Sequence, residues 1–149
     1  MALSRQKTAA VRTSGGDLAA KGAYELAPSE GEAEVTLFAS GTEVALAMAA
    51  RTSLQAEGIG ARVVSTPCWE LFERQPEAYR AGVIGRAPVR IAIEAGVRQG
   101  WDRFIGEDGL FVGMTGFGAS APYEKLYAEF GITAEAAVDA VKAKLTRNA

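Results

Sequence analysis

The sequence predicts an α/β domain in which helices cover both faces of a parallel sheet. Segments with the composition of strands alternate with helical segments in units of about 25–30 residues, which is typical of βαβ architecture. The chain has 149 residues, a length that suits one domain. It shows no internal repeats and no low-complexity tracts.

Five segments have the apolar character of strands: 23–27, 34–40, 61–66, 89–93 and 110–114. The first is short and is closed by Pro28, which predicts an edge position because proline cannot donate to a central ladder. The second, "EVTLFAS", is a buried strand that ends at Gly41. Pro67 stops the third.

Helical segments separate these strands: about 16 residues from Thr42, then 69–75, 76–84, 101–105, 122–130 and 133–145. Ser40 and Glu43 have the spacing of a capping box at the start of the first helix, and Gly58 marks its end. Thr133 caps the last helix. The apolar positions of that helix share one face (Ala134, Val138, Val141 and Leu145).

The composition excludes several classes of function. The net charge is −2, so the chain lacks the basic footprint of a nucleic-acid-binding protein. It has no histidine and one cysteine, Cys68, which argues against zinc sites and excludes Ser-His-Asp and Cys-His catalysis. A lone cysteine forms no internal disulfide and favours a cytoplasmic setting. Catalysis would need carboxylates, lysines or a cofactor.

The residues "GFGASA" at 116–121 fit a dinucleotide-binding fingerprint and follow an apolar strand. That site also needs an acidic residue at the end of a second strand, to bind the ribose. Asp139 has the right spacing but lies within the predicted last helix. We interpret the pattern as a tight strand-to-helix turn, capped by Ser120, that presents Phe117 to a partner surface.

Ligands of parallel sheets bind at the carboxyl ends of the strands. The N–H groups at 40–42 could hold a phosphate there, although Ser40 and Glu43 suit capping better. Glu94 directly follows a predicted strand, and burial would raise its pKa and suit it to acid–base work. Hydrogen bonds that hold the loop are the alternative. Glu94, Trp101 and Phe117 are therefore the candidates for a strand-end site or an interface.

Six phrases together resemble one family: "ALSRQ" (2–6), "KGAYEL" (21–26), "FASGTEVALA" (38–47), "ARVVSTPCWELFERQPEAYR" (61–80), "RIAIEAG" (90–96) and "GMTGFGASAPYEKLYAEFGIT" (113–133). In order and over nearly the whole chain, they resemble the C-terminal domain of transketolase. The resemblance implies a three-layer α/β fold with a mostly parallel five-stranded sheet. Residues 1–22 would be the linker from a preceding pyrimidine-binding domain, and 23–149 the C-terminal domain.

The resemblance also implies a parent enzyme that moves a two-carbon ketol unit between sugar phosphates, in the pentose phosphate pathway or the Calvin cycle. This parent is a cytoplasmic homodimer that uses thiamine diphosphate with Mg²⁺ or Ca²⁺, bound by the preceding domains. The fragment itself would hold no catalytic, cofactor or metal residue and would serve assembly and dimer contacts. Arg5, in the S-R-Q motif, would bind the sugar phosphate in the intact enzyme.

Two alternatives remain open at this stage. The chain could be a stand-alone or split-subunit α/β module that binds a phosphate or nucleotide at its strand ends. It could also be an interaction module that docks in trans onto separate partner domains.

Overall fold

A computed structural model describes residues 6–12 and 15–148, and its centre is a five-stranded sheet. The strands are β1 (Tyr24–Ala27), β2 (Val35–Ala39), β3 (Ala61–Ser65), β4 (Val89–Val97) and β5 (Leu110–Met114). Their order is β1-β3-β2-β4-β5, and only the β1–β3 pair is antiparallel. The predicted fold class, a mostly parallel five-stranded sheet with helices on both faces, is confirmed.

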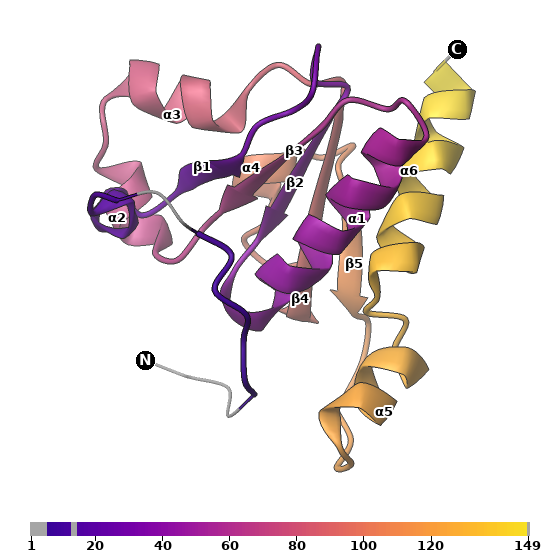
Figure 1. Cartoon of the computed structure of the whole chain (residues 1–149). Coiled ribbons are helices and arrows are strands. Elements are labelled where there is room, and N and C mark those ends of the chain that lie inside the picture. The colour runs from indigo at the N-terminus through magenta and orange to yellow at the C-terminus, as the bar shows by residue number, and fades with distance from the viewer. Residues whose placement is uncertain (1–5, 13–14, 149) are drawn as a thin grey trace.

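One face of the sheet is covered by α1 (Val44–Ala56) and α6 (Ala134–Asn148), which lie side by side in Figure 1. The buried residues of α1 recur at helical spacing, and they pack on strand residues such as Leu37, Val63 and Ile91. Leu37 pairs in parallel register with Val63 on one side and Ile91 on the other. This core therefore combines a period of two from the strands with a helical period from α1 and α6.

The opposite face is covered by η1 (Leu18–Lys21), α2 (Trp69–Glu73), α3 (Glu77–Ile84) and α4 (Asp102–Ile105). Five aromatic rings pack together beneath these short helices: Phe38, Trp69, Phe72, Trp101 and Phe104. Aromatic side chains bury large areas. A few rings therefore fill this core, where the covering helices are too short to supply a long apolar stripe.

Two predicted helix caps are wrong, and one is confirmed. A short η2 (Gly41–Glu43) precedes α1, and Ser40 makes no side-chain capping bond. Likewise α5 (Tyr123–Glu129) begins after Pro122 without a side-chain cap, so Ser120 does not cap it. Thr133 does cap α6, because its hydroxyl accepts a hydrogen bond from the N–H of Ala136 at 3.1 Å.

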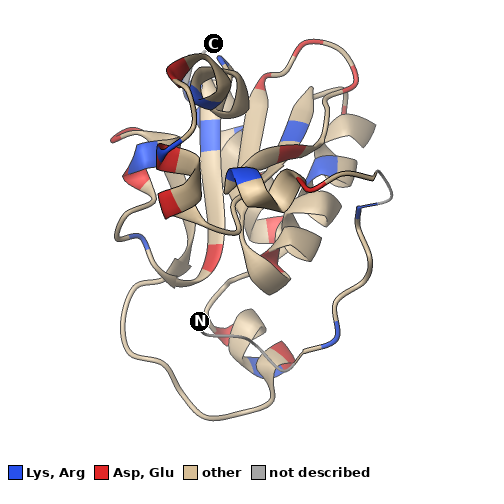
Figure 2. Ribbon diagram, turned by 90° about the vertical axis from the view of Figure 1, so that its left-hand side faces the viewer, with Lys and Arg blue, Asp and Glu red and all other residues tan. Residues whose placement is uncertain are grey.

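The N-terminal segment lies against the domain. Val11 packs on the core of the α1–α6 face, and Asp17 caps η1 by accepting from the N–H of Ala20 at 3.2 Å. In the view of Figure 2, basic and acidic positions are interspersed over the ribbon. Among the described residues, no helix combines the length and the apolar character needed to cross a membrane.

Candidate strand-end site

The carboxyl edge of the sheet brings together the ends of β2, β4 and β5 with α5, at the bottom of Figure 1. Ser40, directly after β2, donates a hydrogen bond from its hydroxyl to a carboxylate oxygen of Glu94 at 2.8 Å. This bond is the reason that Ser40 leaves the helix end uncapped. The bond joins the end of β2 to Glu94 of β4 at this edge.

Glu94 lies within β4 rather than after it, because β4 continues to Val97 through an irregularity in its pairing with β5. Burial raises the pKa of its carboxyl group. The hydrogen bond from Ser40 acts in the opposite direction, the negative charge of Glu43 raises the pKa further, and a backbone hydrogen bond from Ala95 lowers it. A raised pKa was the property expected of this residue.

Glu43 is the residue of this site that the sequence did not reveal, because its spacing from Ser40 suggested a helix cap. It is 4% exposed and accepts hydrogen bonds from the hydroxyls of Thr42, at 2.7 Å, and Tyr127. Burial and the bond to Glu43 raise the pKa of Tyr127. Tyr127 comes from α5, far along the chain, so no local motif could have indicated the contact.

The two carboxylates make this edge unsuited to phosphate. Within the described part of the chain, neither Glu43 nor Glu94 forms an ion pair with a lysine or an arginine. Two carboxylates without a cation repel an anion, and this opposes a phosphate site at 40–42. Across the described residues, no cluster of three or more Cys, Asp or Glu side chains has the arrangement of a metal site.

Replacing Glu94 by glutamine tests the effect of its burial. Between the ordinary value near 4.5 and the higher pKa in the folded chain, the folded state binds more protons than the unfolded state. The stability of the wild type therefore falls as the pH rises through this window. We expect Glu94→Gln to remove that fall, so the variant gains stability relative to the wild type as the pH rises above about 4.5.

Urea denaturation across this pH range measures the difference, and Glu129→Gln, an exposed position on α5, is the matched control. The amide oxygen of glutamine still accepts the bond from Ser40. An unchanged pH dependence in Glu94→Gln would show that burial does not act on this group.

The glycine pattern at 116–121 does not form the predicted tight turn. Residues 115–122 are an exposed connection between β5 and α5, and neither Gly116 nor Gly118 has a positive φ. An added Cβ would meet no atom within 4 Å at either glycine, so no close backbone approach requires them. Asp139 lies exposed on α6. The geometry of a dinucleotide site is absent from this loop.

The exposed aromatic predicted for this loop is present: Phe117 is 100% exposed. A cavity of about 360 Å³ lies beside it, lined mainly by apolar groups, including Val97, Met114, Leu126 and Phe130. Tyr123 and Val97 are also largely exposed. We call Val97, Phe117, Tyr123 and this cavity the apolar edge patch.

The remaining candidates lie elsewhere. Trp101 is 1% exposed and belongs to the aromatic core, so its ring is not available to an interface.

Arg5 lies outside the described residues. Its neighbour Gln6 is described, and the side chain of Gln6 reaches Tyr127. The described residues that follow the motif run along the carboxyl edge of the sheet, where Thr8 and Ala9 line a cavity with Thr42.

Comparisons with known proteins give one consistent result. The family model for the transketolase-like TK C-terminal domain matches residues 22–133. A transketolase of Rhodobacter capsulatus is 54% identical over 97% of this chain and 23% of its own length. The solved transketolase of Leishmania mexicana matches 87% of this chain and 18% of its own, with 40% identity and a TM-score of 0.79.

A split-gene transketolase, solved as an inactive β4 tetramer, shares the fold, with 23% identity and a TM-score of 0.75. The matched region spans 95% of this chain and 48% of the split-gene chain. The chain spans less than a quarter of the length of the curated transketolases that it matches: 23% of the Rhodobacter capsulatus protein, and 22% and 20% of two others.

Proposed function

This chain belongs to the transketolase-like C-terminal domain family, and from that premise we propose that it is the third domain of a transketolase. The full-length enzyme transfers a two-carbon ketol unit from a ketose phosphate to an aldose phosphate, in the cytoplasm. Thiamine diphosphate, bound with Mg²⁺ or Ca²⁺ on the preceding domains, supplies the carbanion chemistry. The match over residues 22–133 is the observation that carries this proposal.

We propose that the chain itself holds neither the cofactor nor the reacting groups. A diphosphate with its metal needs a metal-ligand set and cationic or N–H donors. The strand-end edge instead presents the buried Glu43 and the half-buried Glu94, tied to neighbouring hydroxyl groups. These residues do not fit a diphosphate group.

The proposed role of the chain is assembly with the preceding domains and with a second subunit. Monomeric proteins rarely expose a large contiguous apolar patch unless a partner covers it. The apolar edge patch has this character, with Phe117 at its tip. Residues 6–12 run along the same edge, where Thr8, Ala9 and Val11 line a cavity of about 240 Å³ with Thr42.

The path of residues 6–12 along this edge supports a proposed domain organisation. We propose that residues 1–22 link a pyrimidine-binding domain to a C-terminal domain at 23–149, and that the preceding domain meets the carboxyl edge of the sheet. Arg5 would then stand between the two, where its guanidinium group binds the phosphate of the sugar in the full-length enzyme. The described residues 6–12, which follow Arg5, line the same edge beside Thr42.

Co-purification with the separately expressed preceding domains tests the role of the patch. We expect Phe117→Asp to weaken capture about tenfold or more, because an unpaired carboxylate would be buried in the contact. Ala143→Asp adds the same charge to an exposed site on α6 and should leave capture unchanged. Equal capture of both variants would remove the patch from the interface.

Titration with thiamine diphosphate, NAD and ATP separates this role from that of a free-standing ligand-binding module. We expect no saturable binding of these three compounds at micromolar concentration. Micromolar affinity for one of them would favour the module, whether it stands alone or is one subunit of a split enzyme.

A further inference from the structure

The segment between β5 and α6 has little buried surface of its own. Residues 115–122 are an exposed connection, and α5 follows them without a buried residue. In Figure 1, both extend beyond the lower end of the sheet. The nearest buried residues on either side are Val112 and Ile132, which are 7% and 1% exposed. We call residues 115–131 the edge flap.

Hydrogen bonds join the edge flap to the domain through one side chain. In the described chain, the turn and cap hydrogen bonds of its backbone stay between Pro122 and Ile132, so none of them reaches a strand or another helix. The hydroxyl of Tyr127 donates to the carboxylate of Glu43 and lies 3.4 Å from the hydroxyl of Thr42. Among the described residues, Tyr127 is therefore the polar fastening of the flap.

The apolar packing beneath the flap is incomplete. Leu126, Tyr127 and Phe130 line the cavity of about 360 Å³, and Val97 and Met114 belong to its other wall. Atoms beside an unfilled space lack contact partners on one side, so they gain less dispersion energy. The flap thus rests on partial apolar contacts together with the Tyr127 hydroxyl.

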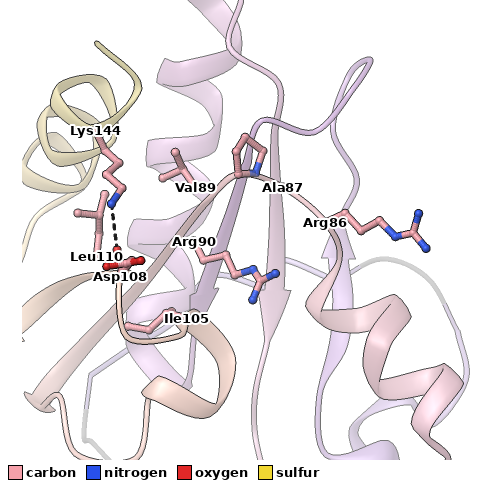
Figure 3. Close-up of a pocket in the computed structure, with 10 residues that line it drawn as sticks. Arg86, Ala87, Val89, Arg90, Ile105, Asp108, Leu110 and Lys144 are labelled. Carbon is pink, nitrogen blue, oxygen red and sulfur yellow. Dashed lines mark hydrogen bonds between the residues drawn. The ribbon is translucent and has the colours of Figure 1, made fainter. Parts of the chain in front are cut away.

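The loop that enters β5, at the opposite edge of the sheet, is fastened more firmly. Lys144 donates to the carbonyl of Asp108 at 3.3 Å, as the dashed line in Figure 3 shows. Arg98 donates to three further carbonyls of this loop, those of Gly106 at 3.1 Å, Glu107 at 3.0 Å and Gly109 at 2.8 Å. Within the described residues, the connection that leaves β5 at 115–122 has no comparable bonds from side chains of the domain.

We propose that the edge flap is a lid, which opens as one unit while the rest of the domain stays folded, and that the hydrogen bond from Tyr127 to Glu43 is its latch. Segments with few buried apolar contacts open at a lower free energy than the core. The closed flap leaves Glu43 only 4% exposed. Opening uncovers this carboxylate and the apolar wall at Val97 and Met114, so the flap controls access to the carboxyl edge. The lid follows from contacts within this chain and does not depend on the proposed function.

Amide hydrogen exchange of the 149-residue chain, followed by NMR, tests the lid. The reporters are the amides of Leu126 and Phe130 in the flap and those of Val138 and Val141 in α6. We expect the flap amides to be protected about a hundredfold less than the α6 amides, or weaker still. The flap amides exchange when the lid opens, whereas the α6 amides exchange when the domain unfolds.

Tyr127→Phe tests the latch, because it keeps the ring and removes the hydroxyl. We expect the protection of the flap amides to fall about tenfold or more, since a hydrogen bond to a carboxylate is lost. Tyr123→Phe is the matched control, because it removes the hydroxyl of a largely exposed tyrosine on the same helix. It should leave the protection of the flap unchanged.

Val64→Ala separates opening of the lid from unfolding of the domain. Val64 is 0% exposed and belongs to the core on the opposite face of the sheet. Loss of its two methyl groups should lower the protection of the α6 amides about tenfold. The flap amides should keep their protection, because that core stays packed when the lid opens.

Four results would overturn the proposal. Equal protection of the flap and α6 in the wild type, or an equal loss in both after Val64→Ala, would show that the flap opens only when the domain unfolds. Unchanged flap protection in Tyr127→Phe, or an equal loss in Tyr123→Phe, would show that the hydroxyl of Tyr127 is not a latch.

Discussion

Replacing Trp101 by alanine is expected to lower the free energy of unfolding by about 3–5 kcal/mol. Its ring is 1% exposed and packs edge-on against Trp69, at a centroid distance of 5.0 Å. Phe104 lies 5.8 Å away on the same side. Removal of the indole leaves a cavity that the short helices α2 and α4 cannot fill without losing their own contacts. Denaturation by urea, followed by circular dichroism, measures the change.

Phe117→Ala is the matched control, because that ring is 100% exposed. Its effect on the unfolding free energy should stay within about 0.5 kcal/mol. The loss in Trp101→Ala is a large part of the 5–15 kcal/mol that typically separates folded from unfolded domains. A loss below about 1 kcal/mol would contradict the assignment of Trp101 to the core.

Gly22→Ala is expected to cost about 2–5 kcal/mol, the sum of a backbone cost and a steric cost. Gly22 has a φ of +82°, which only glycine adopts readily. A Cβ at this position would lie 2.2 Å from the backbone nitrogen of Phe72 and 2.3 Å from the carbonyl oxygen of Cys68. The clash involves backbone atoms at the start of α2, so α2 must move away from β1.

Gly58→Ala separates the two costs. Gly58 has a φ of +81°, almost the same as that of Gly22, but an added Cβ would meet no atom within 4 Å. Its substitution should therefore cost only the backbone part, about 1–2 kcal/mol. Equal losses at Gly22 and Gly58, compared by urea denaturation, would show that α2 does not press against Gly22.

Much of the fold could be predicted because its signals are local. The apolar segments at 34–40, 61–66 and 110–114 form β2, β3 and β5, and the apolar residues after Thr133 form one buried face of α6. The sequence predicts where the strands and helices lie more closely than it predicts where they end. β4 continues past Ile93 to Val97, and α6 continues past Leu145 to Asn148, because pairing and packing extend both elements.

The strand-end site could be predicted only in part, because its contacts join distant segments. The end of an apolar segment indicates Glu94, but local spacing predicts a helix cap at Ser40, which instead donates to Glu94. The Ser40 hydroxyl can bond either to the helix end or to Glu94, and in the structure it bonds to Glu94. Local spacing likewise predicts a capping role for Glu43, whose donor Tyr127 comes from the distant α5. Trp101, predicted to lie near a strand end, instead fills the core.

The most direct measurement is the rate of ketol transfer by this chain alone. The assay contains thiamine diphosphate, Mg²⁺, a ketose phosphate donor and an aldose phosphate acceptor, with a full-length transketolase as the positive control. A non-catalytic third domain gives no rate above that of the cofactor without protein. Turnover that is proportional to the concentration of the chain would contradict the proposal that the chemistry belongs to the preceding domains.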